Sequence, residues 1–148
     1  MSTRSTTHFL SAGADKPTAI IYRHPDGYPE GAGADILDFL DQCAELSDSR
    51  FNDPSYLAAK YVVFLADMFN YSYHLDNLDK TRPKSRLDFI SVGVVDEDPG
   101  DIDYRYVITC HGRDKRPSVH CYTHGEGDWT IVGDWQQLAE KARQPSAS

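Results

Sequence analysis

The chain has 148 residues, 40 % hydrophobic and 26 % charged, the composition of an ordinary globular domain that can bury a substantial core without a metal or disulfide. No apolar run approaches the roughly 20 residues that a membrane-spanning helix needs, and no secretory signal begins the chain, so we expect a cytoplasmic protein. The formal net charge of −8 opposes general binding to the phosphate backbone of nucleic acids.

Two strands are predicted at the start of the chain. Thr3 to Leu10 and Thr18 to Tyr22 are rich in β-branched and apolar residues, and a turn at Gly13 to Pro17 separates them. The two strands should therefore pair as a hairpin.

Two helices are predicted next. From Gly33 to Glu45 apolar residues recur at three- and four-residue spacing, which indicates an amphipathic helix. Asp53 followed by Pro54 is a strong helix start. The helix from Pro54 to Phe69 is apolar on nearly all sides, so we expect it to be central to the core, with Tyr61 and Phe64 buried.

A polar loop and a strand are predicted in the middle of the chain. Residues 70 to 86 are polar and rich in tyrosine, which favours a loop. Leu87 to Val95 is rich in β-branched residues and predicts a strand, which a turn at Asp96 to Asp103 sends back.

A second hairpin follows, from Tyr104 to His111 and from Ser118 to His124. If its turn centres on Lys115 and Arg116, Cys110 faces Cys121 and His111 faces His120. Alternation then assigns two faces to the hairpin. The inward residues are Tyr104, Tyr106, Ile108, Cys110, Val119 and Cys121, and the outward residues are Arg105, Thr109, His111, His120, Tyr122 and His124.

The end of the chain predicts a short strand at Thr130 to Val132 and a last helix at Trp135 to Ala142. Asp134 and Gln137 have the spacing of a capping box, and residues 144 to 148 should be frayed. The whole predicts one α+β domain over residues 1–148, a two-layer sandwich in which helices pack on one face of a mainly antiparallel sheet of five to six strands.

Residues 20 to 37 contain the pattern Tyr22-Arg23-His24-x-Asp26-Gly27-Tyr28-Pro29-x-Gly31-Ala32, in which an apolar strand runs into a polar turn and then a helix start. Together with Met1-Ser2-Thr3-Arg4, this pattern resembles a family of small uncharacterised phage and bacterial proteins. The likeness covers about the first forty residues, and it implies a shared fold and a phage or prophage origin.

A candidate ligand site follows from the same stretch. We expect a small anionic, nucleotide-like ligand to be bound by residues of the turn together with basic residues from elsewhere in the chain. These residues are Arg23, His24, Asp26, Tyr28, Arg82, Arg86 and Arg113. The structural alternative is a stiff connection in which Asp26 and Gly27 form a turn, with φ > 0 at Gly27, and Arg23 makes an internal ion pair.

A candidate interface lies on the outward strip of the second hairpin. Its residues are Arg105, His111, His120, Tyr122 and His124. Their aromatic character favours a partner surface, most simply that of a two-fold homodimer, over a metal site. Cys43, Cys110 and Cys121 show no metal-binding spacing and are expected to be reduced, and no cofactor is expected.

Three functions are compatible with the sequence. The first is a non-catalytic binding protein that sequesters a nucleotide-like host immune signal, by analogy with known anti-defence proteins. The second is a protein-interaction module or inhibitor of a host factor, using the acidic surface and the His/Tyr strip. The third is a small hydrolase with His24 as base and Asp26 as its orienting carboxylate.

Overall fold

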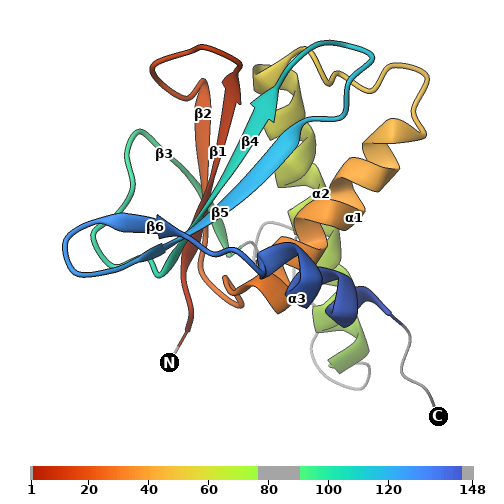
Figure 1. The fold of residues 1–148 in the computed structure, drawn as a ribbon. Coiled ribbons are helices and arrows are strands. Elements are labelled where there is room, and N and C mark those ends of the chain that lie inside the picture. The colour runs from red at the N-terminus through yellow and green to blue at the C-terminus, as the bar shows by residue number, and fades with distance from the viewer. Residues whose placement is uncertain (1, 77–90, 145–148) are drawn as a thin grey trace.

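The computed structural model describes residues 2–76 and 91–144, in which six strands form one sheet and helices pack on one face of it (Figure 1). The strands are β1 (Ser5–Ser11), β2 (Ala19–Arg23), β3 (Val92–Val95), β4 (Tyr104–Cys110), β5 (Ser118–His124) and β6 (Trp129–Ile131). The helices are α1 (Ala34–Ala44), α2 (Pro54–Asp76) and α3 (Trp135–Arg143), with a π-helical turn η1 (Pro29–Gly33) before α1. The expected α+β fold is confirmed.

The sheet has the strand order β3-β2-β1-β4-β5-β6. Its neighbouring strands are antiparallel except β1 and β4, which run parallel with Phe9 opposite Ile108. The β1–β2 hairpin is as predicted. The parallel pair arises because the chain passes through α1, α2 and β3 before it returns beside β1.

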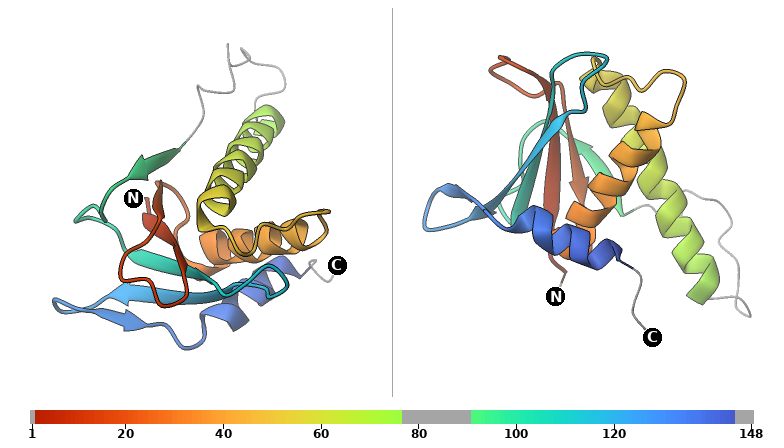
Figure 2. Two further views of the ribbon diagram at one scale, coloured as in Figure 1. Left: turned by 90° about the horizontal axis from the view of Figure 1, so that it is seen from above. Right: turned by 45° about the vertical axis from the view of Figure 1, so that its right-hand side comes forward.

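The core lies between the sheet and the helices (Figure 2). From the sheet, alternate side chains such as Phe9, Ile21 and Ile108 point inward and are almost fully buried. The Tyr61 ring of α2 packs 5.6 Å from the Phe9 ring, and the Trp135 ring of α3 packs edge-on to an inward tyrosine of β4. Burial of these large side chains holds the two layers together.

Helix α2 differs from its prediction in length and in exposure. It continues to Asp76, so the loop expected at 70–86 is wrong for its first seven residues, and residues 77–90 lie outside the described part of the chain. Tyr61 is buried, but Phe64 is only partly buried, and Val63 is 62 % exposed. The expectation of a helix without an exposed face is therefore wrong, because no layer formed by residues 2–76 and 91–144 covers one side of α2.

The start of α2 is as predicted, since Asp53 Oδ1 accepts a hydrogen bond from Tyr56 N at 3.2 Å. The capping box at α3 is not formed: Asp134 makes no side-chain cap, and its carbonyl oxygen accepts from Leu138 N instead. In the strand expected at Leu87 to Val95, the described β3 begins only at Val92.

The β4–β5 hairpin keeps the predicted faces but has a different register. Tyr106 lies opposite Cys121, so the predicted pairs Cys110–Cys121 and His111–His120 are wrong by four residues. Lys115 N donates to Gly112 O at 3.2 Å, which places the turn nearer to the start of the loop than expected. A shift by an even number of residues leaves every side chain on its expected face.

Candidate functional site

Arg23 lies on the inner face of the sheet and is 3 % exposed. Its Nη1 donates to Asp35 Oδ2 at 2.6 Å, its Nε donates to the Pro25 carbonyl at 2.7 Å, and its Cζ lies 5.3 Å from the centre of the Phe69 ring. Burial raises the pKa of Asp35, and the Arg23 guanidinium opposes that rise. Arg23 thus joins the end of β2 to α1 and α2 as an internal cation, as the structural alternative proposed.

His24 lies on the opposite, outer side of the sheet. Its Nδ1 is 3.1 Å from the Tyr22 hydroxyl and 3.5 Å from Arg4 Nε, and Arg4 Nη1 donates to Asp101 Oδ2 at 2.6 Å. Consecutive residues of a strand point to opposite faces, so the fold does not bring Arg23 and His24 to one ligand.

Asp26 and Tyr28 bond to each other rather than to His24. The Tyr28 hydroxyl donates to Asp26 Oδ1 at 3.0 Å, a contact that raises the pKa of Tyr28. Among the described residues, no bond joins His24 to Asp26, so the base and carboxylate of the hydrolase hypothesis are not paired.

The glycines of the same segment are required by close packing. The positive φ, 55°, belongs to Asp26 and not to Gly27 as expected. A Cβ on Gly27 would lie 2.8 Å from Ser5 Cβ and 2.9 Å from Thr3 O, and one on Gly31 would lie 2.3 Å from Asp26 O. Much of the segment therefore serves as a tight crossing between β2, the start of β1 and α1.

The basic residues expected to close the ligand site are not gathered there. Arg82 and Arg86 lie outside the described residues. Arg113 is exposed in the β4–β5 loop, beyond the end of β4, whereas Arg23 lies level with Ser5 and hence with Tyr104 at the start of β4. The seven residues of β4, a length of about 20 Å, therefore separate Arg113 from the level of Arg23.

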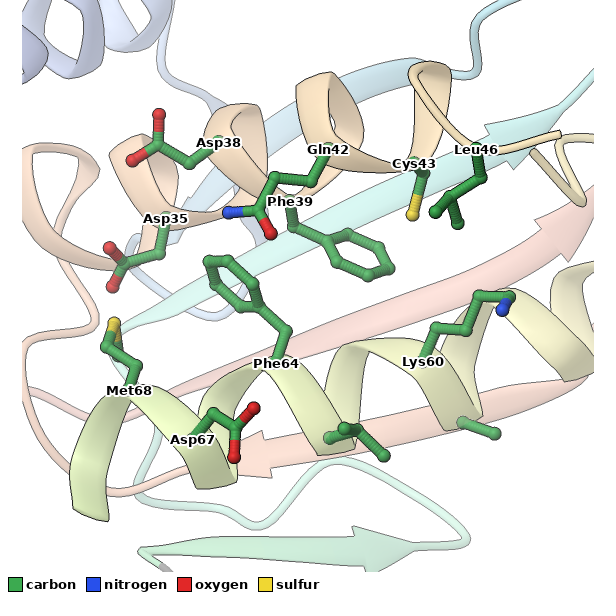
Figure 3. Close-up of a pocket in the computed structure, with 12 residues that line it drawn as sticks. Asp35, Asp38, Phe39, Gln42, Cys43, Leu46, Lys60, Phe64, Asp67 and Met68 are labelled. Carbon is green, nitrogen blue, oxygen red and sulfur yellow. The ribbon is translucent and has the colours of Figure 1, made fainter. Parts of the chain in front are cut away.

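A groove with a volume of about 750 Å³ lies between α1 and α2 (Figure 3). The two helices run in opposite directions along it: Asp35 and Met68 lie at one end, and Leu46 and Lys60 at the other. The Phe39 and Phe64 rings, 5.6 Å apart, form its apolar centre. Exposed Val63 and Leu46 extend this apolar surface to solvent.

Charges are unequally distributed along the groove. Three carboxylates, of Asp35, Asp38 and Asp67, lie toward the Met68 end, and Lys60 lies toward the Leu46 end. Asp35 is held by Arg23 and Asp38 by Arg143, the latter at 2.8 Å, and the Asp38 side chain remains 48 % exposed. Arg143 also contacts Asp41 and Glu140, and Arg116 contacts Asp41, so the carboxylates beside this end of the groove belong to a network of ion pairs.

Cys43 brings a thiol, a group that can act as a nucleophile, to the wall of this groove, but its environment makes it unreactive. The thiol lines the groove but is almost fully buried, and burial raises its pKa despite the opposing charge of Lys60. Burial also raises the pKa of Cys110 to about 11 and of Cys121 to about 12. Thiols in this state are protonated at neutral pH and are poor nucleophiles.

The predicted outward strip is only partly continuous. Arg105 lies directly opposite Tyr122, and His120 and His124 are exposed on the same face. His111 lies past the end of β4, where its Nε2 is 2.9 Å from Ser118 Oγ. The role of these residues as a partner or dimer surface stays a prediction.

Asp98, in the β3–β4 loop, covers part of this outer face. Its carboxylate accepts hydrogen bonds from Thr6 Oγ1 and Arg105 Nε, both at 2.6 Å, and lies 2.8 Å from His8 Nε2. Burial works to raise the pKa of Asp98, but the bonds from His8, Thr6 and Arg105 hold it at about 2. Arg105 Cζ also lies 4.4 Å from the centre of the Trp129 ring.

The sequence interpretation missed the groove and the Asp98 cluster for different reasons. The groove had one visible signal, since Pro54 to Phe69 has more apolar surface than one sheet face can cover. The Asp98 cluster had no such signal, because Thr6 and His8 lie about 90 residues from Asp98 in the sequence.

No group of three or more His, Cys, Asp or Glu side chains within residues 2–76 and 91–144 is arranged to hold a metal ion. In the same ranges, no helix is long and apolar enough to cross a membrane. Searches among known protein families, curated proteins and solved structures found no match to this chain.

Proposed function

We propose that the protein is a non-catalytic interaction module that binds a segment of a partner protein in the groove between α1 and α2. The observation that carries this proposal is the groove itself, where Phe39, Phe64 and Met68 form an apolar strip between two helices. Exposed apolar surface of this kind, bordered by charged residues, is typical of interaction sites.

The charges of the groove favour this function over capture of a nucleotide. Lys60 is the basic residue of the lining, and the carboxylates of Asp35 and Asp38 there are held by Arg23 and Arg143. A phosphate needs several cationic or N–H donors, whereas the lining offers mainly the apolar strip around Phe39 and Phe64, which suits apolar side chains of a partner. Arg23, the expected phosphate ligand, is already bonded to Asp35.

The same geometry supports binding over hydrolysis. His24 and Asp26 are each bonded to a different tyrosine, and the thiol of Cys43 in the groove has a raised pKa. That the partner is a host factor, which a phage origin would imply, stays a prediction.

The test selects peptides from a random library on the immobilised protein and compares their affinity for two matched variants. Val63→Lys places a charge in the groove, and Ile131→Lys places the same charge on β6; the native side chains are 62 % and 60 % exposed. Both substitutions are at the surface and should change stability by less than about 0.5 kcal/mol.

We expect the selected peptides to lose at least tenfold in affinity for Val63→Lys and to bind Ile131→Lys as they bind the native protein. Loss of peptide affinity in Ile131→Lys alone would place the site on the outward strip and overturn the proposal. So would a nucleotide that raises the melting temperature of the protein while no peptide is selected.

A further inference from the structure

We infer that the open edge of β5 binds an extended segment of a partner protein, which adds a strand to the sheet beside Val119. This edge lies on the other side of α1 from the α1–α2 groove, and the inference does not rest on the proposed function. It follows from three features: the backbone of β5, the hollow beside it and the path of the chain after β6.

The chain leaves the edge of β5 early. β6 pairs with Tyr122 to His124, the last residues of β5, and the chain then turns away into α3 (Figure 1). The last backbone bond on this edge runs from Val132 N to Cys121 O, at 2.9 Å. The first half of β5 therefore has β4 on one side and, among residues 2–76 and 91–144, no strand on the other.

The free backbone groups on this edge belong to Val119. Antiparallel strands bond through alternate residues, and the N–H and C=O of one residue point to the same side. Cys121 bonds on the β6 side, whereas His124 N donates to Asp103 O on the β4 side. Val119, two residues before Cys121, therefore directs both groups to the open edge, where no backbone group of the described residues bonds to them.

These groups favour an extended partner over a helical one. A donor and an acceptor that point sideways from a sheet are matched by the backbone of another extended chain. A helix cannot match them, because its own backbone groups are bonded internally. The partner strand thus continues the ladder at the point where β6 leaves it.

A hollow of about 590 Å³ lies beside the same edge. Val119, Leu37 and Leu40 of α1, and Trp135 of α3 line it and belong to the core side of the sheet. Residues opposite each other on neighbouring strands have side chains on one face, so the partner residue beside Val119 directs its side chain into this hollow. Its two neighbours point to the outer face, where His120 is exposed. The segment should therefore have an apolar residue between polar ones.

The path of the chain after β6 excludes a second copy of this edge as the partner. Symmetric pairing about Val119 would place Pro117 of one copy against Cys121 of the other. That place is occupied, because Val132 N already donates to Cys121 O. The added strand must therefore come from a different protein, and it must end or turn away before it reaches Val132.

The first measurement is amide hydrogen exchange in the free protein, followed by NMR. His120 lies opposite Val107 and bonds to β4, so its amide should be protected. We expect the Val119 amide to exchange about tenfold faster or more, although its side chain is buried. Slow exchange at Val119 would mean that the chain covers its own edge, and it would overturn the inference.

The second measurement uses acetylated and amidated peptides of about seven residues, in which threonine alternates with valine, leucine or phenylalanine. Each peptide is made in two N-methylated forms, with the methyl groups on either the threonine or the apolar amides. Only one set of amides faces β5, so we expect one form to protect the Val119 amide and the other to bind about tenfold more weakly or worse. Equal affinity of the two forms would overturn strand pairing. So would a panel in which no peptide protects Val119 at millimolar concentration.

Two neighbouring residues of α3 provide matched variants. Gln136 and Gln137 are both exposed, and of the two Gln136 lines the hollow. We expect Gln136→Trp to fill the hollow and weaken peptide binding about tenfold, and Gln137→Trp to leave it unchanged. Unchanged binding in Gln136→Trp would overturn the inference.

The variant Val63→Lys separates this site from the α1–α2 groove. It places a charge in the groove and should leave binding at the β5 edge unchanged. Peptides that are lost in Val63→Lys and kept in Gln136→Trp would overturn the inference and leave the proposed function standing. The reverse pattern would support the β5 edge whatever binds in the groove.

Discussion

Two ion pairs on opposite faces of the sheet show how differently the fold treats a carboxylate. On the inner face Asp35 has one cation, Arg23, and burial raises its pKa. On the outer face Asp98 accepts from Thr6 and Arg105 and lies against His8, and its pKa falls to about 2. The difference shows that several hydrogen-bond donors can outweigh the cost of burial, whereas one guanidinium in the core does not.

The largest effect is expected from breaking the inner pair. Arg23→Met leaves Asp35 close to the core without its cation and should lower the free energy of unfolding by about 3–5 kcal/mol. Because protonation can neutralise Asp35, the loss should be smaller at pH 4.5 than at pH 7.5. Urea denaturation at the two pH values measures both.

The control for the inner pair is the double variant Arg23→Met with Asp35→Leu. It removes both charges and should recover most of the lost stability, since no unpaired carboxylate remains. A double variant as unstable as Arg23→Met alone would mean that packing of the arginine against Phe69, rather than the ion pair, holds the two layers.

A smaller effect is expected on the outer face. Asp98→Asn should cost about 2 kcal/mol at pH 7, which corresponds to the depression of its pKa from 3.8 to about 2. This stabilisation is complete above about pH 4 and is lost as the pH falls toward 2, because the folded pKa lies below the ordinary value. The free energy of unfolding should therefore fall less steeply between pH 4 and pH 2 in Asp98→Asn than in the native protein.

The smallest effect is expected from a conservative substitution among the residues that contact Asp98. Arg105→Lys keeps a positive charge near Asp98 but loses the planar contact with Trp129 and the geometry of the guanidinium. We expect a loss of about 0.5–1 kcal/mol in thermal unfolding, together with a change in tryptophan fluorescence. A loss as large as that of Asp98→Asn would show that Arg105 causes nearly all of the lowering of the Asp98 pKa.

Local patterns were sufficient for most elements. The hairpin of β1 and β2, the amphipathic α1 and the start of α2 at Asp53 follow from propensity, periodicity and capping, which act over a few residues. Alternation also assigned the faces of β4 and β5 correctly, although their register was predicted wrongly, because an even shift preserves the faces.

The sequence identified residues 20 to 37 as a strand that runs into a polar turn and then a helix start, but it did not show what each residue does there. That Arg23 and His24 lie on opposite faces follows from strand alternation once β2 is known to include Arg23 and the backbone of His24 to continue its pairing, at Ser91. That Gly27 is needed against Ser5, and Arg23 against Asp35, depends on contacts between elements that meet only in the folded chain.

Only the tertiary structure created the groove. The apolar residues of α1 and α2 were visible in the sequence, but periodicity cannot say which of them a neighbouring layer covers. The sheet covers one side of α2 and buries Tyr61, while Val63 and part of Phe64 remain uncovered. The carboxylates at one end and Lys60 at the other come together because the two helices run in opposite directions, a relation that depends on packing and not on any local pattern.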